Sequence, residues 1–332
     1  MRRAIYLVMK KTFQGLAVGL ALLGHGLVAA GAAGRADDVL LFTYFTGNGE
    51  DGLHLAWSED GYAWTALNGG RSVLAPRIGS KEKLMRDPCV LRGPDGIFRL
   101  VWTSGWWERG IGYASSPDLV HWSGQQEIPV MAHEPTARNA WAPEIAWDDR
   151  RHHFMIFWAT TIPDRFAATA GSAEDQLNHR LYFTTTEDFR TFAPTRLLYD
   201  PGFCVIDATF LHADGRHYLI VKDETLHPPA KNLRLAAAAD LEGPFRELSP
   251  PFSPPGLWAE GPTAIRVGGD YLVYFDAYRE NRFGVLRSAD LKTWEDVSIR
   301  LKMPGAGTPE RVRHGTVIRV PRAMLDGLRP SP

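Results

Sequence analysis

Short apolar runs separated by polar turns extend along most of this chain and predict an all-β protein. Five runs rich in β-branched and aromatic residues have the length and composition of strands. Several follow Asp-Gly or Gly-Asp pairs, which are typical of hairpin turns. No long 3.6-residue period interrupts these runs, which lie at 39–44, 98–102, 153–158, 218–221 and 271–275.

A turn motif follows each run and repeats five times. Its common features are a small or hydroxyl residue, an Asp two positions later and an aromatic residue four or five positions after the Asp. The Asp positions are Asp60, Asp118, Asp188, Asp240 and Asp290, so the copies are 50 to 70 residues apart. This interval matches a four-stranded propeller blade. The repeated Asp can accept hydrogen bonds from nearby backbone donors, so we expect it to be structural.

A further strand precedes four of the five runs, and its place predicts how the ring closes. These strands begin near Asp87, Ala142, Val205 and Glu260, whereas the first repeat has no such strand. Residues 313–320 read as a strand without a blade of its own. We therefore predict a five-bladed β-propeller closed by pairing the N- and C-terminal strands in one blade, which removes exposed sheet edges. The longest insertion, 163–178, is expected to be a loop near the site.

The first 37 residues have the layout of a secretory signal peptide. Basic residues precede the apolar stretch 16–33, and small residues follow it. An uncleaved membrane anchor is the alternative, because this stretch approaches the length that spans a bilayer. We expect residues 38–322 to form the propeller and 323–332 a C-terminal tail. The expected location is secreted or periplasmic, without stable membrane insertion after signal cleavage.

Composition narrows the expected partners. The net charge is −1, from 37 basic and 38 acidic residues, which gives no indication of nucleic-acid binding. The 11 Trp residues suit stacking on sugars, although packing between blades could use most of them. Only Cys89 and Cys204 are present. We expect both to be buried thiols, with a disulfide between them as the alternative.

Three of the inner strands carry a carboxylate at their head, namely Asp87, Asp207 and Glu260. Inverting hydrolysis of a glycosidic bond needs one protonated carboxyl group beside the leaving oxygen. It also needs an ionised carboxylate that holds water on the opposite ring face, about 6.5–9.5 Å away. Three strands around one axis can present such a set. Each of these acids could instead serve in a turn or at a strand edge.

With these motifs in place, the sequence resembles glycoside hydrolase family 43 over residues 38–320. That family comprises five-bladed propellers that act on arabinose- and xylose-containing glycans. The motifs that carry the resemblance are Arg86-Asp87-Pro88, Trp141-Ala142-Pro143-Glu144, 203–211, Glu260-Gly261-Pro262 and Arg313-His314-Gly315. The offset start of the blades indicates a divergent member.

The resemblance implies an inverting mechanism in which Asp87 is the general base, Glu260 the general acid and Asp207 the carboxylate that orients and tunes the acid. A charged Asp207 is expected to raise the pKa of Glu260 and keep it protonated near neutral pH. Glu144 is expected to contact a substrate hydroxyl or a structural hydrogen-bond partner. No cofactor is expected to be required. A structural calcium on the axis, with His314 beside it, stays open, as does a packed core role for His314.

Four Trp residues lie beside these motifs and are candidate sugar contacts, with packing between blades as the alternative. They are Trp106, Trp107, Trp141 and Trp258. The expected partner is an oligo- or polysaccharide. A binding propeller without catalysis is the alternative from another class. A fructan-type glycosidase is a further alternative, but its Asn-Asp-Pro and Glu-Cys motifs do not occur here.

Overall fold

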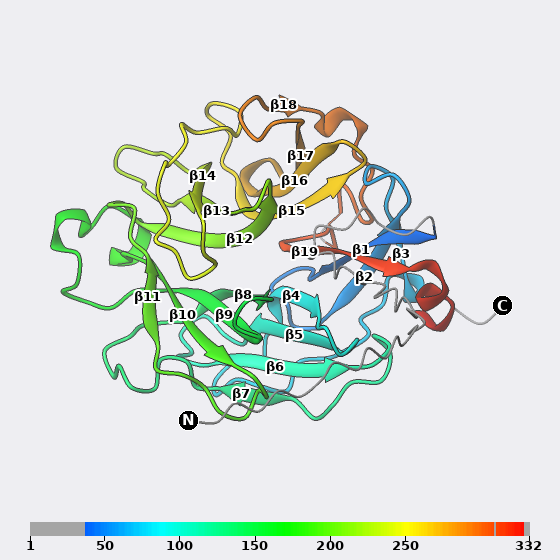
Figure 1. Cartoon of the computed structure of the whole chain (residues 1–332), viewed down its shortest axis with the longest axis horizontal. Helices are drawn as coiled ribbons and strands as arrows, with labels where there is room; N and C mark the ends of the chain where they lie inside the picture. Colours follow the sequence, from blue (N-terminus) through cyan, green and yellow to red (C-terminus); the bar gives the residue numbers. More distant parts are fainter. Residues whose placement is uncertain (1–36, 309, 329–332) are drawn as a thin grey trace, which may run out of the picture. The chain divides into compact units, whose positions relative to one another are not determined.

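The computed structural model describes residues 37–308 and 310–328. Residues 1–36 of the predicted signal peptide and 329–332 of the predicted tail therefore lie outside the described residues. Within them, 19 strands form five antiparallel sheets arranged as blades around a common axis (Figure 1). The prediction of an all-β, five-bladed propeller is confirmed.

The blades follow one another along the chain, except that blade 1 combines both ends of the described chain. Blade 1 contains β19 (Gly315–Pro321), β1 (Asp38–Tyr44), β2 (His54–Ser58) and β3 (Thr65–Ala66). Blade 2 contains β4 (Arg86–Arg92), β5 (Phe98–Thr103), β6 (Ile111–Ser116) and β7 (Gln126–Ile128). Blade 3 contains β8 (Trp141–Asp148), β9 (His153–Thr160), β10 (Arg180–Thr186) and β11 (Arg196–Tyr199).

Blade 4 has three strands and blade 5 has four. Blade 4 contains β12 (Val205–Ala213), β13 (Arg216–Asp223) and β14 (Asn232–Ala238). Blade 5 contains β15 (Glu260–Val267), β16 (Asp270–Ala277), β17 (Arg282–Ser288) and β18 (Glu295–Asp296). Short 3-10 turns lie between some strands, namely η1 (Asn68–Gly70), η2 (Ala167–Thr169), η3 (Glu174–Gln176), η4 (Tyr278–Glu280) and η5 (Ser298–Arg300). A further one, η6 (Arg322–Leu328), follows β19.

The first strand of each blade, counted outward from the axis, belongs to a closed inner ring. These strands are β19, β4, β8, β12 and β15; each contacts the next, and β15 contacts β19. In blade 1, β19 pairs antiparallel with β1, from Asp38 opposite Pro321 to Tyr44 opposite Gly315. The two ends of the described chain therefore share one sheet.

The core consists of apolar layers between neighbouring blades. In β1, Val39 and Leu41 pack toward blade 2, whereas Leu40 and Phe42 pack toward blade 5. Because side chains alternate between the two faces of a strand and both faces are covered, the strands read as continuous apolar runs. This explains why the sequence shows unbroken hydrophobic stretches where a half-exposed sheet would alternate.

The repeated Asp residues have the expected structural role. Oδ1 of Asp60 accepts the backbone N–H groups of Tyr62 and Ala63 at 2.8 and 2.9 Å. Asp118, Asp188 and Asp290 accept the equivalent pairs of N–H groups in their own turns. The motif fixes the turn between two strands, which is why it recurs once per blade.

Two further features concern the thiols and the end of the described chain. Cys89 and Cys204 are both buried and free, so the expectation of unpaired thiols is confirmed and the disulfide alternative is wrong. The turn η6 buries Leu325 and Leu328 in the layer between blades 1 and 2. Within the described ranges, no helix is both long and apolar enough to cross a bilayer.

Candidate active site

Four inner strands share the same irregularity near their first residues. In β4, β8, β12 and β15, two residues oppose a single residue of the neighbouring strand, which defines a β-bulge. The first bulged residue has a positive φ in every case: 50° for Asp87, 45° for Ala142, 51° for Asp207 and 56° for Gly261. Three of these residues are not glycine, so each costs about 1–2 kcal/mol of backbone strain. Such bulges redirect side chains, and here two of them carry a carboxylate.

Asp87 is held as an ionised carboxylate. Its Oδ2 accepts the hydroxyl of Thr103 at 2.7 Å, and its Oδ1 lies 3.2 Å from Nδ1 of His314. The Thr103 hydroxyl in turn accepts the backbone N–H of Ala142 at 2.8 Å, which fixes its orientation. Burial alone would raise the pKa of Asp87, but His314, Arg86 and the Thr103 hydrogen bond together lower it well below its usual range.

Asp207 lies on the inner strand of blade 4 and contacts blade 5. Its Oδ2 accepts the backbone N–H of Gly261 at 3.0 Å, and its side chain is buried. Burial, with smaller contributions from Glu260 and Asp87, raises the pKa of Asp207 to about 6, although His314 and Lys222 act in the opposite direction. Asp207 therefore takes up a proton more readily than an exposed aspartate does.

Glu260 lies between two cations. Its Oε2 accepts a hydrogen bond from Nζ of Lys222 at 3.1 Å, and its Oε1 accepts one from Nη2 of Arg313 at 3.2 Å. Burial acts to raise the pKa of Glu260, but Lys222 and Arg313 outweigh it and lower the pKa. The prediction that Asp207 keeps Glu260 protonated near neutral pH is therefore wrong, because the sequence did not reveal the two cations that stabilise the ionised form.

His314 contacts Asp87 and is close enough to Asp207 and Glu260 for their charges to act on it. It precedes β19, is buried, and lies directly over Gly261, where a Cβ atom would approach the ring to 2.3 Å. Burial lowers its pKa, but Asp87, Asp207 and Glu260 together raise the pKa of His314 to about 9. Among the described residues, no group of three or more His, Cys, Asp or Glu side chains is placed to hold a metal ion. The axial calcium stays a prediction.

Glu144 lies on β8, outside the lining of the cavity that Asp87, Asp207 and Glu260 share. Its Oε2 accepts the hydroxyl of Thr209 at 2.9 Å in a buried position. Burial, reinforced by the charge of Asp207, raises the pKa of Glu144 to about 8. Its observed contact is thus the structural hydrogen bond that the sequence left open.

Three of the four candidate Trp residues form an aromatic wall, which we define as Trp106, Trp107 and Trp141. The rings of Trp106 and Trp141 meet edge to face at 5.6 Å, and the Trp141 indole N–H donates to the carbonyl of Trp106 at 2.8 Å. Trp107 is 51% exposed, and the guanidinium of Arg138 lies 5.2 Å from the centre of its ring, so part of the Trp107 surface is open to a ligand. Trp258 does not line the pocket, and the guanidinium of Arg279 covers its ring at 3.3 Å.

The carboxylates and the aromatic wall enclose one cavity of about 320 Å³. Asp87, Asp207, Glu260 and His314 line it, together with Trp106, Trp107 and Trp141. The insertion 163–178 supplies another wall through Ala173, Glu174, Asp175 and Leu177, which confirms the expectation that this loop lies near the site. Side chains from all five blades or their connecting loops thus meet at one end of the axis.

Several residues of the pocket were not anticipated from the sequence. Lys222 and Tyr278 follow apolar strand residues and look like ordinary edge positions, and Thr103 ends a buried strand. His179 is buried behind Trp141, with ring centres 4.9 Å apart. Its Nε2 lies 2.8 Å from Nδ2 of Asn139, and burial lowers its pKa to about 3. The sequence indicates these residues only through their position. Each lies at or next to an end of the second or third strand of its blade, at the end of the propeller where the carboxylates lie.

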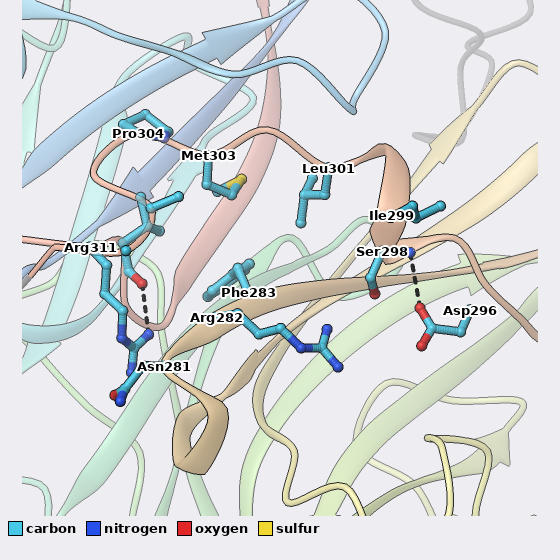
Figure 2. Close-up of a pocket in the computed structure, with 13 residues that line it drawn as sticks. Asn281, Arg282, Phe283, Asp296, Ser298, Ile299, Leu301, Met303, Pro304 and Arg311 are labelled. Atoms are coloured by element: carbon cyan, nitrogen blue, oxygen red, sulfur yellow. Dashed lines mark hydrogen bonds between the residues drawn. The ribbon is translucent and has the colours of Figure 1, made fainter.

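A second pocket, with none of these carboxylates in its lining, lies beside the third and fourth strands of blade 5. Figure 2 shows the residues that line it. It measures about 480 Å³, and its sides come from β17, β18, η5 and the segment 301–312. Phe283, Leu301 and Met303 give it an apolar lining, and the backbone N–H of Ser298 donates to Asp296 at 2.9 Å. We refer to it as the outer pocket.

Comparison with known proteins agrees with this geometry. The sequence profile of a glycosyl hydrolase 43-related family, described as a probable glycosyl hydrolase domain, matches residues 38–326. An α-L-arabinofuranosidase from Bifidobacterium longum is 24% identical over 349 residues, covering 84% of this chain and 32% of that protein. The chain thus spans about a third of the length of that relative.

Two solved structures share the fold. An α-L-arabinofuranosidase from Lactobacillus brevis superposes with a TM-score of 0.52 at 16% identity, covering 64% of this chain and 72% of that one. A xylan β-1,4-xylosidase from Bacillus halodurans gives a TM-score of 0.52 at 18% identity, covering 70% and 46%. The fold and pocket define a propeller of the glycoside hydrolase class. More specifically, the chain belongs to the glycosyl hydrolase 43-related family as a divergent member of family 43.

Proposed function

We propose that this protein is a secreted or periplasmic inverting glycosidase that removes arabinose or xylose units from plant-type glycans. The observation that carries the proposal is the meeting of Asp87, Asp207 and Glu260, from three different blades, in one cavity of about 320 Å³. The arabinofuranosidase relative and the predicted signal peptide support the substrate class and the location.

Asp87 is the proposed general base. Its contacts with His314 and Thr103 favour the ionised form, which can accept a proton from an attacking water molecule. The water oxygen then forms a bond to the anomeric carbon as the bond to the leaving oxygen breaks. The Thr103 hydroxyl, anchored by the N–H of Ala142, keeps the base at a fixed orientation.

Glu260 is the proposed general acid, and Asp207 supplies the proton that it needs. In the protein without substrate, Glu260 is ionised between Lys222 and Arg313, whereas the pKa of Asp207 is raised to about 6. The charges of the two carboxyl groups influence each other, so a proton taken up by the pair can reside on Glu260 when it is donated to the leaving oxygen. This interaction gives Asp207 a role as proton reservoir beside the acid.

The aromatic wall is the proposed sugar platform. The half-exposed face of Trp107 beside Trp141 offers apolar surface to the carbon-bound hydrogens of a sugar ring. The carboxylates in the same lining would then contact its hydroxyl groups and the reacting oxygen.

The test is hydrolysis of aryl arabinofuranosides and xylosides, arabinan, arabinoxylan and arabinogalactan by the wild type and by Glu260→Gln. We expect the variant to lose about 10²–10⁴-fold in kcat. The loss should be greatest for natural oligosaccharides, since an activated aryl leaving group departs without a proton. Glu295→Gln, on the exposed strand β18, is the matched control and should retain wild-type rates. Retention of the anomeric configuration in the product would contradict the inverting mechanism.

Sugar binding without turnover is the second candidate, and one observation favours it. A carboxylate paired with both Lys222 and Arg313 is well suited to accept hydroxyl hydrogen bonds but is not ready to donate a proton. Binding of oligosaccharides measured by calorimetry, with no product from any substrate in the panel, would support this function over hydrolysis.

A further inference from the structure

A chain of buried ion pairs leads from Glu260 into blade 4. Nζ of Lys222 lies 3.1 Å from Oε2 of Glu260 and 2.6 Å from Oε2 of Glu224. Oε1 of Glu224 lies 2.5 Å from Nζ of Lys231, which is also 3.8 Å from Oε1 of Glu174 in the insertion loop. Cations and carboxylates alternate along this chain.

Both lysines of this chain are almost completely shielded from water. Lys222 is 1% exposed and Lys231 is 0% exposed. An ammonium group at such a position is stable only beside compensating carboxylates. Lys222 also lies 4.7 Å from the centre of the Tyr278 ring. The Lys222 ammonium group is therefore held by Glu224, Glu260 and the Tyr278 ring, next to an oxygen of the proposed acid.

Other groups face Glu260 as well, and Lys222 and Arg313 each join it to a second acid. Arg313 is shared between Glu260 and Asp276, with its Nε 2.6 Å from Oδ2 of Asp276. The charged and titratable groups that face Glu260 from the neighbouring elements are Lys222, Arg313, His314, Asp207, Asp276 and Tyr278. Glu224 contacts Lys222 but not Glu260 in this ion-pair chain. It can therefore change the attraction between Lys222 and Glu260 without touching Glu260.

We propose that Lys222 is a positioning residue for Glu260, and that Glu224 sets how strongly the Lys222 charge acts on it. The inference rests on the proposed function, because it concerns the general acid of that reaction. A lysine shared by two carboxylates divides its hydrogen bonds and its attraction between them. Removing the lysine should therefore favour the protonated form of Glu260, and neutralising Glu224 should favour the ionised form.

A direct titration tests this without relying on activity. In ¹³C NMR of the full chain with labelled glutamate side chains, the Glu260 signal is the one that disappears in Glu260→Gln. We expect Lys222→Met to raise the pKa of Glu260 by about one unit or more, since an opposite charge at this range shifts a carboxyl pKa by about 1–3 units. Glu224→Gln should lower it. Lys292→Met, at an exposed turn position, should leave it unchanged.

The same variants give a kinetic readout once a substrate is found. Since the acid must be protonated, Lys222→Met should move the alkaline limb of kcat/KM to higher pH, and Glu224→Gln should move it to lower pH. If Lys222→Met does not fold, the downward shift in Glu224→Gln still decides. Shifts in the same direction in both variants, or no shift in either, would overturn the proposal.

The outcomes distinguish a failure of the acid role of Glu260 from a failure of the positioning role of Lys222. If Glu260→Gln retains full activity, the acid role fails, and the NMR titration still reports on Lys222. If Glu260→Gln is inactive but the Glu260 titration is unchanged in Lys222→Met and Glu224→Gln, only the positioning role fails.

Discussion

The cavity lined by Asp87, Asp207 and Glu260, here called the axial pocket, is smaller than the outer pocket and has a different chemistry. The axial pocket, of about 320 Å³, contains two bulged carboxylates with left-handed backbone and a buried lysine. The outer pocket, of about 480 Å³, is larger, but its acid Asp296 is exposed and Ile299 beside it is 96% exposed (Figure 2). The outer pocket also has a left-handed residue, Asn281, and a buried Arg311 paired with Asp276, but it lacks the set of three carboxylates. Buried carboxylates that meet from several blades therefore identify the site better than pocket volume does.

The largest expected effect follows from removing the proposed base. Asp87→Asn preserves the size of the side chain and can still contact Thr103, but it cannot accept a proton from water. We expect kcat to fall by about 10²–10⁴-fold on any substrate that the wild type hydrolyses. Asp296→Asn makes the same chemical change in the outer pocket and should retain wild-type kcat. Steady-state kinetics of both variants on one substrate measures the contrast.

Equal losses of activity in Asp87→Asn and Asp296→Asn would contradict the difference between the two pockets. Such a result would mean that the outer pocket takes part in turnover. Circular dichroism of both proteins should accompany the kinetics, because Asp87 also pairs with His314.

The sequence predicted those features that depend on local pattern. The Asp turn recurs because each turn satisfies its own backbone donors, so five copies revealed five blades without any long-range information. The heads of the inner strands were recognisable because Asp87, Asp207 and Glu260 interrupt or precede apolar runs. Both signals are contained within about ten residues of sequence.

The electrostatics of the site could not be predicted in this way. Lys222 is 38 residues from Glu260, and Arg313 is 53 residues from it, so their contacts depend on how the blades meet. A sequence pattern shows that a carboxylate is present but not which cations face it. The mistaken expectation for the pKa of Glu260 came from considering Asp207 alone.

A smaller effect is expected from filling the space beneath His314. In Gly261→Ala, the new Cβ would lie 2.3 Å from the His314 ring, and the residue would keep a φ of 56°. The left-handed backbone costs about 1–2 kcal/mol, and overpacking adds about 1–3 kcal/mol. We expect the free energy of unfolding to fall by roughly 2–5 kcal/mol. Urea denaturation provides the measurement.

Gly307→Ala in the outer pocket is the matched control, because it isolates the backbone contribution. Gly307 has a φ of 80°, and a Cβ there would meet nothing within 4 Å. Its substitution should cost only the left-handed term of about 1–2 kcal/mol. Equal losses in the two variants would show that His314 moves aside freely, contrary to the packing around it.

The smallest effect concerns the pH dependence of stability, which should differ between a buried and an exposed acid. Folded Glu144 keeps its proton up to about pH 8, whereas its ordinary pKa is 4.5. Between these values unfolding releases a proton, so Glu144 makes the free energy of unfolding decrease as pH rises, by about 1.4 kcal/mol per pH unit. Glu144→Gln has no such proton and can still accept the Thr209 hydrogen bond. Urea denaturation at pH 6 and pH 7 should therefore show a shallower decrease in the variant. Equal slopes in the two proteins would mean that Glu144 is ionised in the folded state, and that the axis beneath the carboxylates is more polar than its packing indicates.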